Sequence, residues 1–223
     1  IGVFLEWMPV CFSKNEKGLS VFDGNHLYEH LDERQSQHGA YDGWMFNYGR
    51  MEVESFLLSN AYYWKEIFHI DGLWFREIAS MLYLDYGKAE NEWISNCHGG
   101  RENLEAIAFL QKCNTMLHAK KDGFLTLAED NSSWPKMTDS VEKEGLGFDY
   151  KWEYRWTRDM KEYMKIDPFF RKGSHNLLTE ASLYIEQENY IVGFPRESEK
   201  TEEVIFGEED QKEASLRLLY GYA

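Results

Sequence analysis

The sequence predicts an α/β fold in which parallel strands alternate with helices. Short apolar runs alternate along the chain with stretches of helical periodicity, which is the pattern of successive βα units. The chain has 223 residues, of which 43% are hydrophobic, and this is enough to form a sizeable core. These observations favour βα units that form a parallel sheet.

Five strands and five helices are expected in chain order. We expect the strands at residues 2–8, 69–75, 124–128, 146–152 and 190–194. Helical spacing of apolar residues predicts helices over 51–68, 101–118, 157–165 and 176–186, with a terminal helix that begins near residue 210. A long polar loop is expected over 9–50, and loops of that length are usually functional. A second loop is expected to run to Gly100, and acidic residues dominate 197–210.

Five strands in this order fit the central portion of a TIM (β/α)8 barrel. We therefore expect residues 1–223 to form part of one barrel domain, without a separate second domain. In such barrels the functional side chains lie at the carboxyl ends of the strands. The residues at those positions are Glu6, Arg76, Glu129 and the pair Arg196 and Glu197.

Charge and cysteine usage exclude several classes of partner. The formal net charge of −15 argues against nucleic acid, which requires a basic face. No apolar run approaches the length of a membrane span, so no membrane partner is expected. The three cysteines are far apart and odd in number, which favours a reducing, cytoplasmic location over a disulfide framework. Both ends of the chain fall inside apparent elements, which suggests a segment of a longer protein with open sheet edges and a tendency to self-associate.

Several sequence blocks carry a family resemblance. They are DGLWFREIASMLYLDY from Asp71 to Tyr86, and GLSVFDGNHLYEH, FNYGRMEVESFLLSNAYYW, GGRENLEAIAFL, TLAED and GLGFDYKW. Together they resemble the catalytic domain of 1,4-alpha-glucan branching enzymes of the α-amylase superfamily, over nearly the whole chain. The resemblance implies glycogen biosynthesis by retaining transfer of α-1,4-glucan chains to α-1,6 positions. It implies glycogen, amylose or maltooligosaccharide as the partner, and no cofactor.

The resemblance also assigns catalytic positions. Where the family has its nucleophilic Asp, this chain has Arg76. Glu129 occupies the general acid/base position. Glu197 occupies the position of the Asp that stabilises the transition state.

Four further positions correspond to substrate-binding residues of the family. Glu6 replaces an Asp, Cys11 a His, Trp74 an Arg and Arg196 a His. No metal site is expected: His26 and His30 have the spacing of two ligands on one helix face, but no third ligand is evident.

These changes predict that the chain does not catalyse branching. Retaining transfer needs a nucleophilic carboxylate beside a protonated one, and a guanidinium cannot serve as a nucleophile. A cation at position 76 would also favour the ionised form of Glu129. Glu77 is not expected to substitute, because neighbouring strand residues point to opposite faces and Glu77 would face the helical layer. The chain is then a pseudoenzyme.

Three hypotheses about function remain open. The chain is a branching transferase that uses Glu129, a non-catalytic glucan-binding or scaffold relative, or a fragment that keeps the fold without a function. Fold alone cannot separate them, because function resides in the site.

Overall fold

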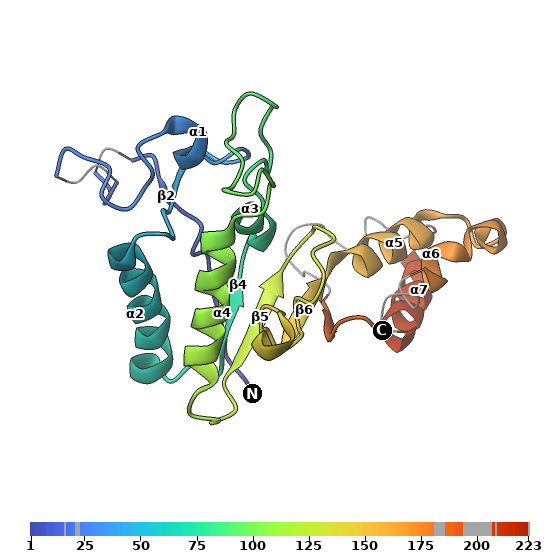
Figure 1. Cartoon of the computed structure of the whole chain (residues 1–223). Coiled ribbons are helices and arrows are strands. Elements are labelled where there is room, and N and C mark those ends of the chain that lie inside the picture. The colour runs from blue at the N-terminus through green and yellow to red at the C-terminus, as the bar shows by residue number, and fades with distance from the viewer. Residues whose placement is uncertain (16, 21–22, 181–185, 194–206, 208, 223) are drawn as a thin grey trace. The chain divides into compact units, whose positions relative to one another are not determined.

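The computed structural model describes residues 1–15, 17–20, 23–180, 186–193, 207 and 209–222. The chain divides into two compact units, Ile1–Tyr150 and Lys151–Ala223, and each is considered by itself. Figure 1 shows the chain coloured from one end to the other.

The first unit is built on three parallel strands. They are β1 (Phe4–Trp7), β4 (Gly72–Phe75) and β5 (Leu125–Glu129), with β4 between the other two. Glu6 lies opposite Trp74, and Trp74 lies opposite Leu127, so these residues are at the same level in the three parallel strands. The α/β prediction is confirmed, although β1 and β4 are shorter than predicted and β5 lies one residue later than predicted, so that it includes Glu129.

Helix α2 (Met51–Phe68) joins β1 to β4 and has the bounds that the sequence predicts. Its buried residues are Val53, Leu57, Ala61 and Lys65, which recur every four residues and therefore form one stripe along the helix. Lys65 is buried with its charge compensated, because its Nζ donates to the Leu117 carbonyl at 2.5 Å and pairs with Asp122 at 3.0 Å.

Helix α4 (Leu104–His118) joins β4 to β5 and contacts α2. The Asn103 side chain caps it by accepting a hydrogen bond from the Ala106 amide at 3.2 Å. The sequence prediction placed the helix start three residues too early. Tyr83 forms an isolated antiparallel bridge with Glu102, so the residues before Asn103 are extended and not helical.

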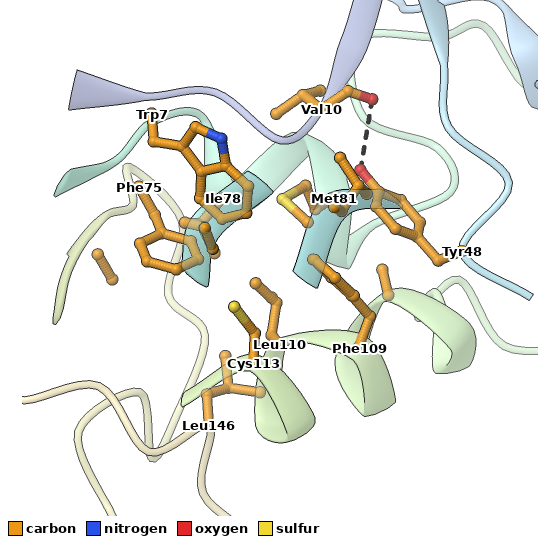
Figure 2. Close-up of a cluster of buried hydrophobic side chains, with 14 of the residues drawn as sticks. Trp7, Val10, Tyr48, Phe75, Ile78, Met81, Phe109, Leu110, Cys113 and Leu146 are labelled. Atoms are coloured by element: carbon orange, nitrogen blue, oxygen red, sulfur yellow. Dashed lines mark hydrogen bonds between the residues drawn. The ribbon is translucent and has the colours of Figure 1, made fainter. Parts of the chain in front are cut away.

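The core of this unit packs between the sheet and the two helices (Figure 2). Phe75 lies edge-on to Trp7, with 4.9 Å between ring centroids. Figure 2 shows Leu110 and Cys113 of α4 facing this group. Tyr48 stacks on Phe109 with ring centroids 5.4 Å apart. Its buried hydroxyl donates to the Pro9 carbonyl at 2.8 Å, so the polar end of the ring is satisfied.

Gly72 allows close approach of strands at the centre of the sheet. A Cβ at this position would collide with the Phe4 ring and would meet the Leu125 carbonyl oxygen at 2.5 Å. No side chain fits between the two flanking strands here without moving one of them, so the parallel register depends on glycine at this position.

The prediction of loops without secondary structure is wrong in two places. The segment after β1 contains β2 (Cys11–Ser13), α1 (Glu33–Ser36) and β3 (Gly43–Met45), and β2 pairs with β3 antiparallel. The segment after β4 contains α3 (Ile78–Leu82), all five residues of which are buried. Such short elements lack a clear periodicity and are stabilised by tertiary contacts, so the sequence pattern does not reveal them. A short 3₁₀ turn, Val141–Lys143, follows β5.

The second unit contains a smaller set of elements. Strands β6 (Tyr150–Glu153) and β7 (Tyr190–Val192) pair in parallel, and α5 (Tyr154–Lys165), α6 (Asn176–Thr179) and α7 (Glu209–Tyr222) accompany them, with a 3₁₀ turn at Arg171–Ser174. Trp156, Met160 and Met164 of α5 form its buried cluster. The prediction of a helix over 176–186 is wrong at its end, because α6 stops at Thr179 and both Glu180 and Glu186 lie in turns; residues 181–185, and the predicted end of the fifth strand at residue 194, lie outside the described residues. Within the described ranges, no helix combines the length and apolar character needed to span a membrane.

Asp149 links α4 to β5. His118 Nε2 lies 2.9 Å from its Oδ2, and the Thr126 amide donates to the same oxygen at 2.7 Å. Partial burial raises the pKa of Asp149, but the bonds from His118 and Thr126 outweigh it, so the pKa is lowered from its ordinary value. The ionised carboxylate therefore stabilises the folded unit.

Truncation of Leu110 should destabilise the first unit strongly. Leu110 is fully buried in the core, so Leu110→Ala removes apolar contacts and leaves a cavity. We expect a loss of about 2–5 kcal/mol in the free energy of unfolding, measured by urea denaturation. The exposed residue Leu31 supplies the control, because Leu31→Ala should cost less than about 0.5 kcal/mol. Equal losses in the two variants would contradict the assignment of the core.

Asp149→Asn should change the pH dependence of stability. Because the pKa of Asp149 is lower in the folded protein than in the unfolded chain, its contribution is complete above the unfolded pKa of about 3.9 and disappears as the pH falls through the folded value. The variant should be less stable than the parent near pH 7, and the difference should shrink in acid. Urea denaturation at several pH values measures this. Asp42→Asn, at an exposed carboxylate, is the control, and a difference independent of pH would refute the prediction.

Candidate functional site

The carboxyl ends of β1, β4 and β5 bring three of the predicted residues together. Glu6 lies in β1, Arg76 follows β4 directly, and Glu129 is the last residue of β5. Because the three strands are parallel and in register, their carboxyl ends lie at the same edge of the sheet. The Arg76 amide also donates to the Trp7 carbonyl at 2.9 Å, which continues the pairing of β1 and β4 past the last residue of β4.

Arg76 bridges the two carboxylates. Its Nη1 donates to Glu6 Oε1 at 2.6 Å, and its Nε forms an ion pair with Glu129 Oε2. The side chains differ in exposure: 59% for Glu6, 28% for Arg76 and 11% for Glu129. The Arg76–Glu129 pair is therefore the better shielded from water, and its charges interact more strongly than those of an exposed pair.

Trp74 lies against the same guanidinium. The centre of the Arg76 guanidinium is 4.9 Å from the centroid of the Trp74 ring, which is the geometry of a cation–π contact. Trp74 lies opposite Glu6 in the strand register. We name Glu6, Trp74, Arg76 and Glu129 the Arg76 cluster.

Cys11 lies in β2, opposite Met45. Burial raises the pKa of the Cys11 thiol, and the Glu77 charge raises it further. A thiol with a raised pKa stays protonated near neutral pH, so Cys11 is a weak nucleophile and a poor metal ligand.

Glu77 has a different orientation from the one predicted. Strand β4 ends at Phe75, and Glu77 has a left-handed backbone with φ 59° and ψ 36° at the start of α3. The alternation of a strand therefore does not apply to it. Its Oε1 accepts a hydrogen bond from the Tyr41 hydroxyl at 2.7 Å, and this bond raises the pKa of Tyr41. The Glu77 carboxylate is bonded to the long segment after β1 and does not face the helical layer.

No pattern in the sequence predicts the hydrogen bond between Tyr41 and Glu77. The two residues are 36 positions apart, and Tyr41 lies in a polar stretch without periodicity. The only hint in the sequence is that a tyrosine hydroxyl can donate a hydrogen bond to a carboxylate.

Within the described ranges, no group of three or more His, Cys, Asp or Glu residues could hold a metal ion. His26 instead lies 3.5 Å from the buried Glu29 carboxylate. Arg196 and Glu197 lie outside the described residues.

Comparison with known proteins supplies the family. No family model matches the chain. The chain is 43% identical over 232 residues to the 1,4-alpha-glucan branching enzyme GlgB of Oleidesulfovibrio alaskensis, covering 100% of this chain and 36% of the relative. It is 44% identical over 232 residues to that of a Synechococcus strain, covering 100% of this chain and 29% of the relative. It is 46% identical over 225 residues to that of Nitrosococcus oceani, covering 99% and 30%. The chain thus spans about a third of the length of these relatives.

Solved structures agree on the fold. An Anoxybacillus α-amylase superposes with a TM-score of 0.61 at 12% identity, covering 100% of this chain and 46% of that chain. The α-amylase of Geobacillus thermoleovorans, complexed with acarbose, superposes with a TM-score of 0.56 at 16% identity, covering 85% and 38%. These similarities confirm the predicted fold class, the central portion of a TIM barrel of the α-amylase type. With 43–46% identity along the chain to proteins that share one name, the chain belongs to the 1,4-alpha-glucan branching enzyme GlgB family.

Proposed function

We propose that this chain is a glucan-binding segment of a branching-enzyme domain that does not catalyse chain transfer. The observation that carries the proposal is the pairing of Arg76 with both Glu6 and Glu129. Retaining transfer requires two carboxyl groups about 5–5.5 Å apart, one of them a nucleophile. Arg76 occupies the position that the resemblance assigns to that nucleophile, and a guanidinium cannot attack a glycosidic carbon.

The same pairing argues against Glu129 as a general acid. A cation in direct contact favours the ionised form of a carboxylate, whereas protonation of the leaving oxygen requires the neutral form. Both carboxylates of the Arg76 cluster are already paired with one guanidinium. We therefore propose that the cluster is an ion-paired end of the sheet and not a reaction centre.

The proposed ligand is an α-1,4-linked glucan such as glycogen, amylose or a maltooligosaccharide. The matched relatives are named for 1,4-alpha-glucan, and one structural neighbour is complexed with acarbose. Aromatic side chains at the carboxyl ends of the strands, among them Trp74, offer apolar faces of the kind that stack on sugar rings. We place this activity in glycogen metabolism, in the cytoplasm, since Cys11, Cys97 and Cys113 are free thiols that suit a reducing compartment.

An active transferase is the second candidate. The observation that favours it is Glu129, which keeps the family's acid/base residue type at the end of β5. Without a carboxylate at position 76, that route would need another nucleophile. Glu77 accepts a hydrogen bond from Tyr41 instead, so we rank this candidate below the binding role.

An assay of chain transfer tests the proposal. With amylose as donor and acceptor, the unaltered chain should form no α-1,6 links above a protein-free control, as counted after debranching of the product. Glu129→Gln should give the same result, and so should the control Glu142→Gln at an exposed carboxylate. Restoring the family residues at four positions (Cys11→His, Trp74→Arg, Arg76→Asp and Arg196→His) tests whether the frame can still support transfer. Branching by the unaltered chain that Glu129→Gln abolishes would overturn the proposal.

We also propose that the isolated chain self-associates. Within the described ranges, β1 pairs with β4 alone, so its other edge presents unpaired backbone groups. Exposed apolar side chains lie on and near it, including Val3 and Phe4. Light scattering after gel filtration should give a mass above that of one chain, and Phe4→Lys should lower it. Tyr62→Lys on α2 is the control, and a monodisperse parent chain with the mass of a monomer would contradict the prediction.

A further inference from the structure

A small cavity in the first unit is walled by α1, by α3 and by the segments that flank these helices. Its volume is about 20 Å³ for the centre of a water molecule, which is room for one water molecule or one ion of about that size. The basic residues that line it are His30, Arg34, His38 and Lys88. Among its described lining residues none is aspartate or glutamate, although the chain has 39 of these against 24 lysines and arginines. We name this space the His38 cavity.

His38 supplies a buried hydrogen-bond donor that has no acceptor. The side chain is 7% exposed, and its Nδ1 accepts from the Ala40 amide at 3.1 Å and from the Tyr41 amide at 3.0 Å. A ring nitrogen that accepts hydrogen bonds carries no proton, so the proton of the neutral imidazole is on Nε2. Nε2 is buried, and no atom of the described residues accepts from it. Because an unpaired buried donor is costly, a ligand that accepts a hydrogen bond suits this position.

Lys88 supplies a positive charge to the same cavity. Its Nζ donates to the Arg34 carbonyl, a neutral acceptor, at 2.7 Å. Burial lowers the pKa of Lys88, and the Glu92 charge offsets only part of that effect. Besides burial, the Lys88 charge lowers the pKa of both His30 and His38, so the ammonium lies near the two rings. A partly buried ammonium is stabilised by an anion that enters its surroundings.

The other strong base of the lining already has a counter-ion. Arg34 Nη2 lies 2.8 Å from Asp32 Oδ2, so the Arg34 charge is largely neutralised. We propose that the His38 cavity is a site for one monovalent anion of the size of chloride, bound by the Nε2–H of His38 and the ammonium of Lys88. A water molecule accepts from the same two donors, but only an anion also offsets the charge of Lys88. This inference does not depend on glucan binding.

The bound anion fastens two segments that are far apart in the sequence. His38 belongs to the segment after β1, and Lys88 to the segment after α3. Their backbones touch at Gly39, where an added Cβ would collide with the Tyr86 carbonyl oxygen. The anion adds a second link beside this contact. Since it binds the folded chain and has no site in the unfolded one, it stabilises the fold by mass action.

Chlorine-35 nuclear magnetic resonance of sodium chloride solutions of the full chain tests the inference. Chloride that exchanges with a protein site gives an excess linewidth, and its decline as chloride is raised gives the Kd. Lys88→Gln keeps a donor for the Arg34 carbonyl but removes the charge, so it should remain folded and weaken the Kd about tenfold or more. Lys136→Gln is the matched control, because Lys136 Nζ also donates to a carbonyl, that of Lys143 at 3.2 Å, away from the cavity.

A second variant and a second measurement keep the test decisive. His38→Phe removes the Nε2–H and should weaken the Kd by a similar factor, with circular dichroism showing that each variant is folded. In urea denaturation the parent chain should be more stable in sodium chloride than in sodium gluconate at the same ionic strength, and Lys88→Gln should lose this difference. A parent chain without excess linewidth would mean that the cavity holds water and would overturn the proposal. Equal Kd values in the parent and the folded cavity variants would overturn it too, because the chloride would then be bound elsewhere.

Discussion

The register that β4 imposes on β1 and β5 is the constraint on which the candidate site depends. Gly72 lets the two outer strands approach, and the pairing of Glu6 with Trp74 fixes which residues reach the carboxyl edge together. A slip of one residue would turn each side chain to the opposite face of the sheet. The Arg76 cluster is thus a product of strand pairing, and the core beneath it, with Phe75 at its centre, keeps the strands in place.

The balance of charge at this edge limits what can replace Arg76 without a cost in stability. Arg76 is surrounded by Glu6 and Glu129, and the three charges sum to −1. Replacing Arg76 by aspartate would leave three carboxylates next to one another, one of them largely buried. Loss of one partner from a fully buried ion pair costs about 3–5 kcal/mol, and the partial exposure of Arg76 reduces that figure here. The ion pairs of Arg76 with Glu6 and Glu129 therefore help to hold the ends of β1, β4 and β5 together.

The sequence predicts the regular elements well and the site only in outline. Helix α2 has its predicted bounds because its buried stripe repeats every four residues over 18 residues. The prediction that chemistry-bearing residues follow the strands placed Glu6, Arg76 and Glu129 on one edge, and the structure shows them in contact. Sequence could not reveal the turn that redirects Glu77, because a left-handed residue between a strand and a five-residue helix leaves no periodic signal. Nor could it reveal the open pocket lined by Tyr83, Asp85, Tyr86, Arg101, Ser132 and Ser133, because its walls come from segments about thirty to fifty residues apart and meet only through tertiary bonds.

The buried bond between Tyr48 and Pro9 has a consequence for how this family can vary. Phe46 also donates its amide to the Val10 carbonyl at 3.1 Å, so the two ends of the long segment after β1 are fastened to each other inside the core. The ends of the segment between them are therefore already held together. Lengthening such a loop costs an entropy that grows only with the logarithm of its length, about 0.6 kcal/mol for each doubling. Insertions at exposed positions between residues 14 and 42 should therefore cost the fold little, so this segment can lengthen while the strands stay fixed.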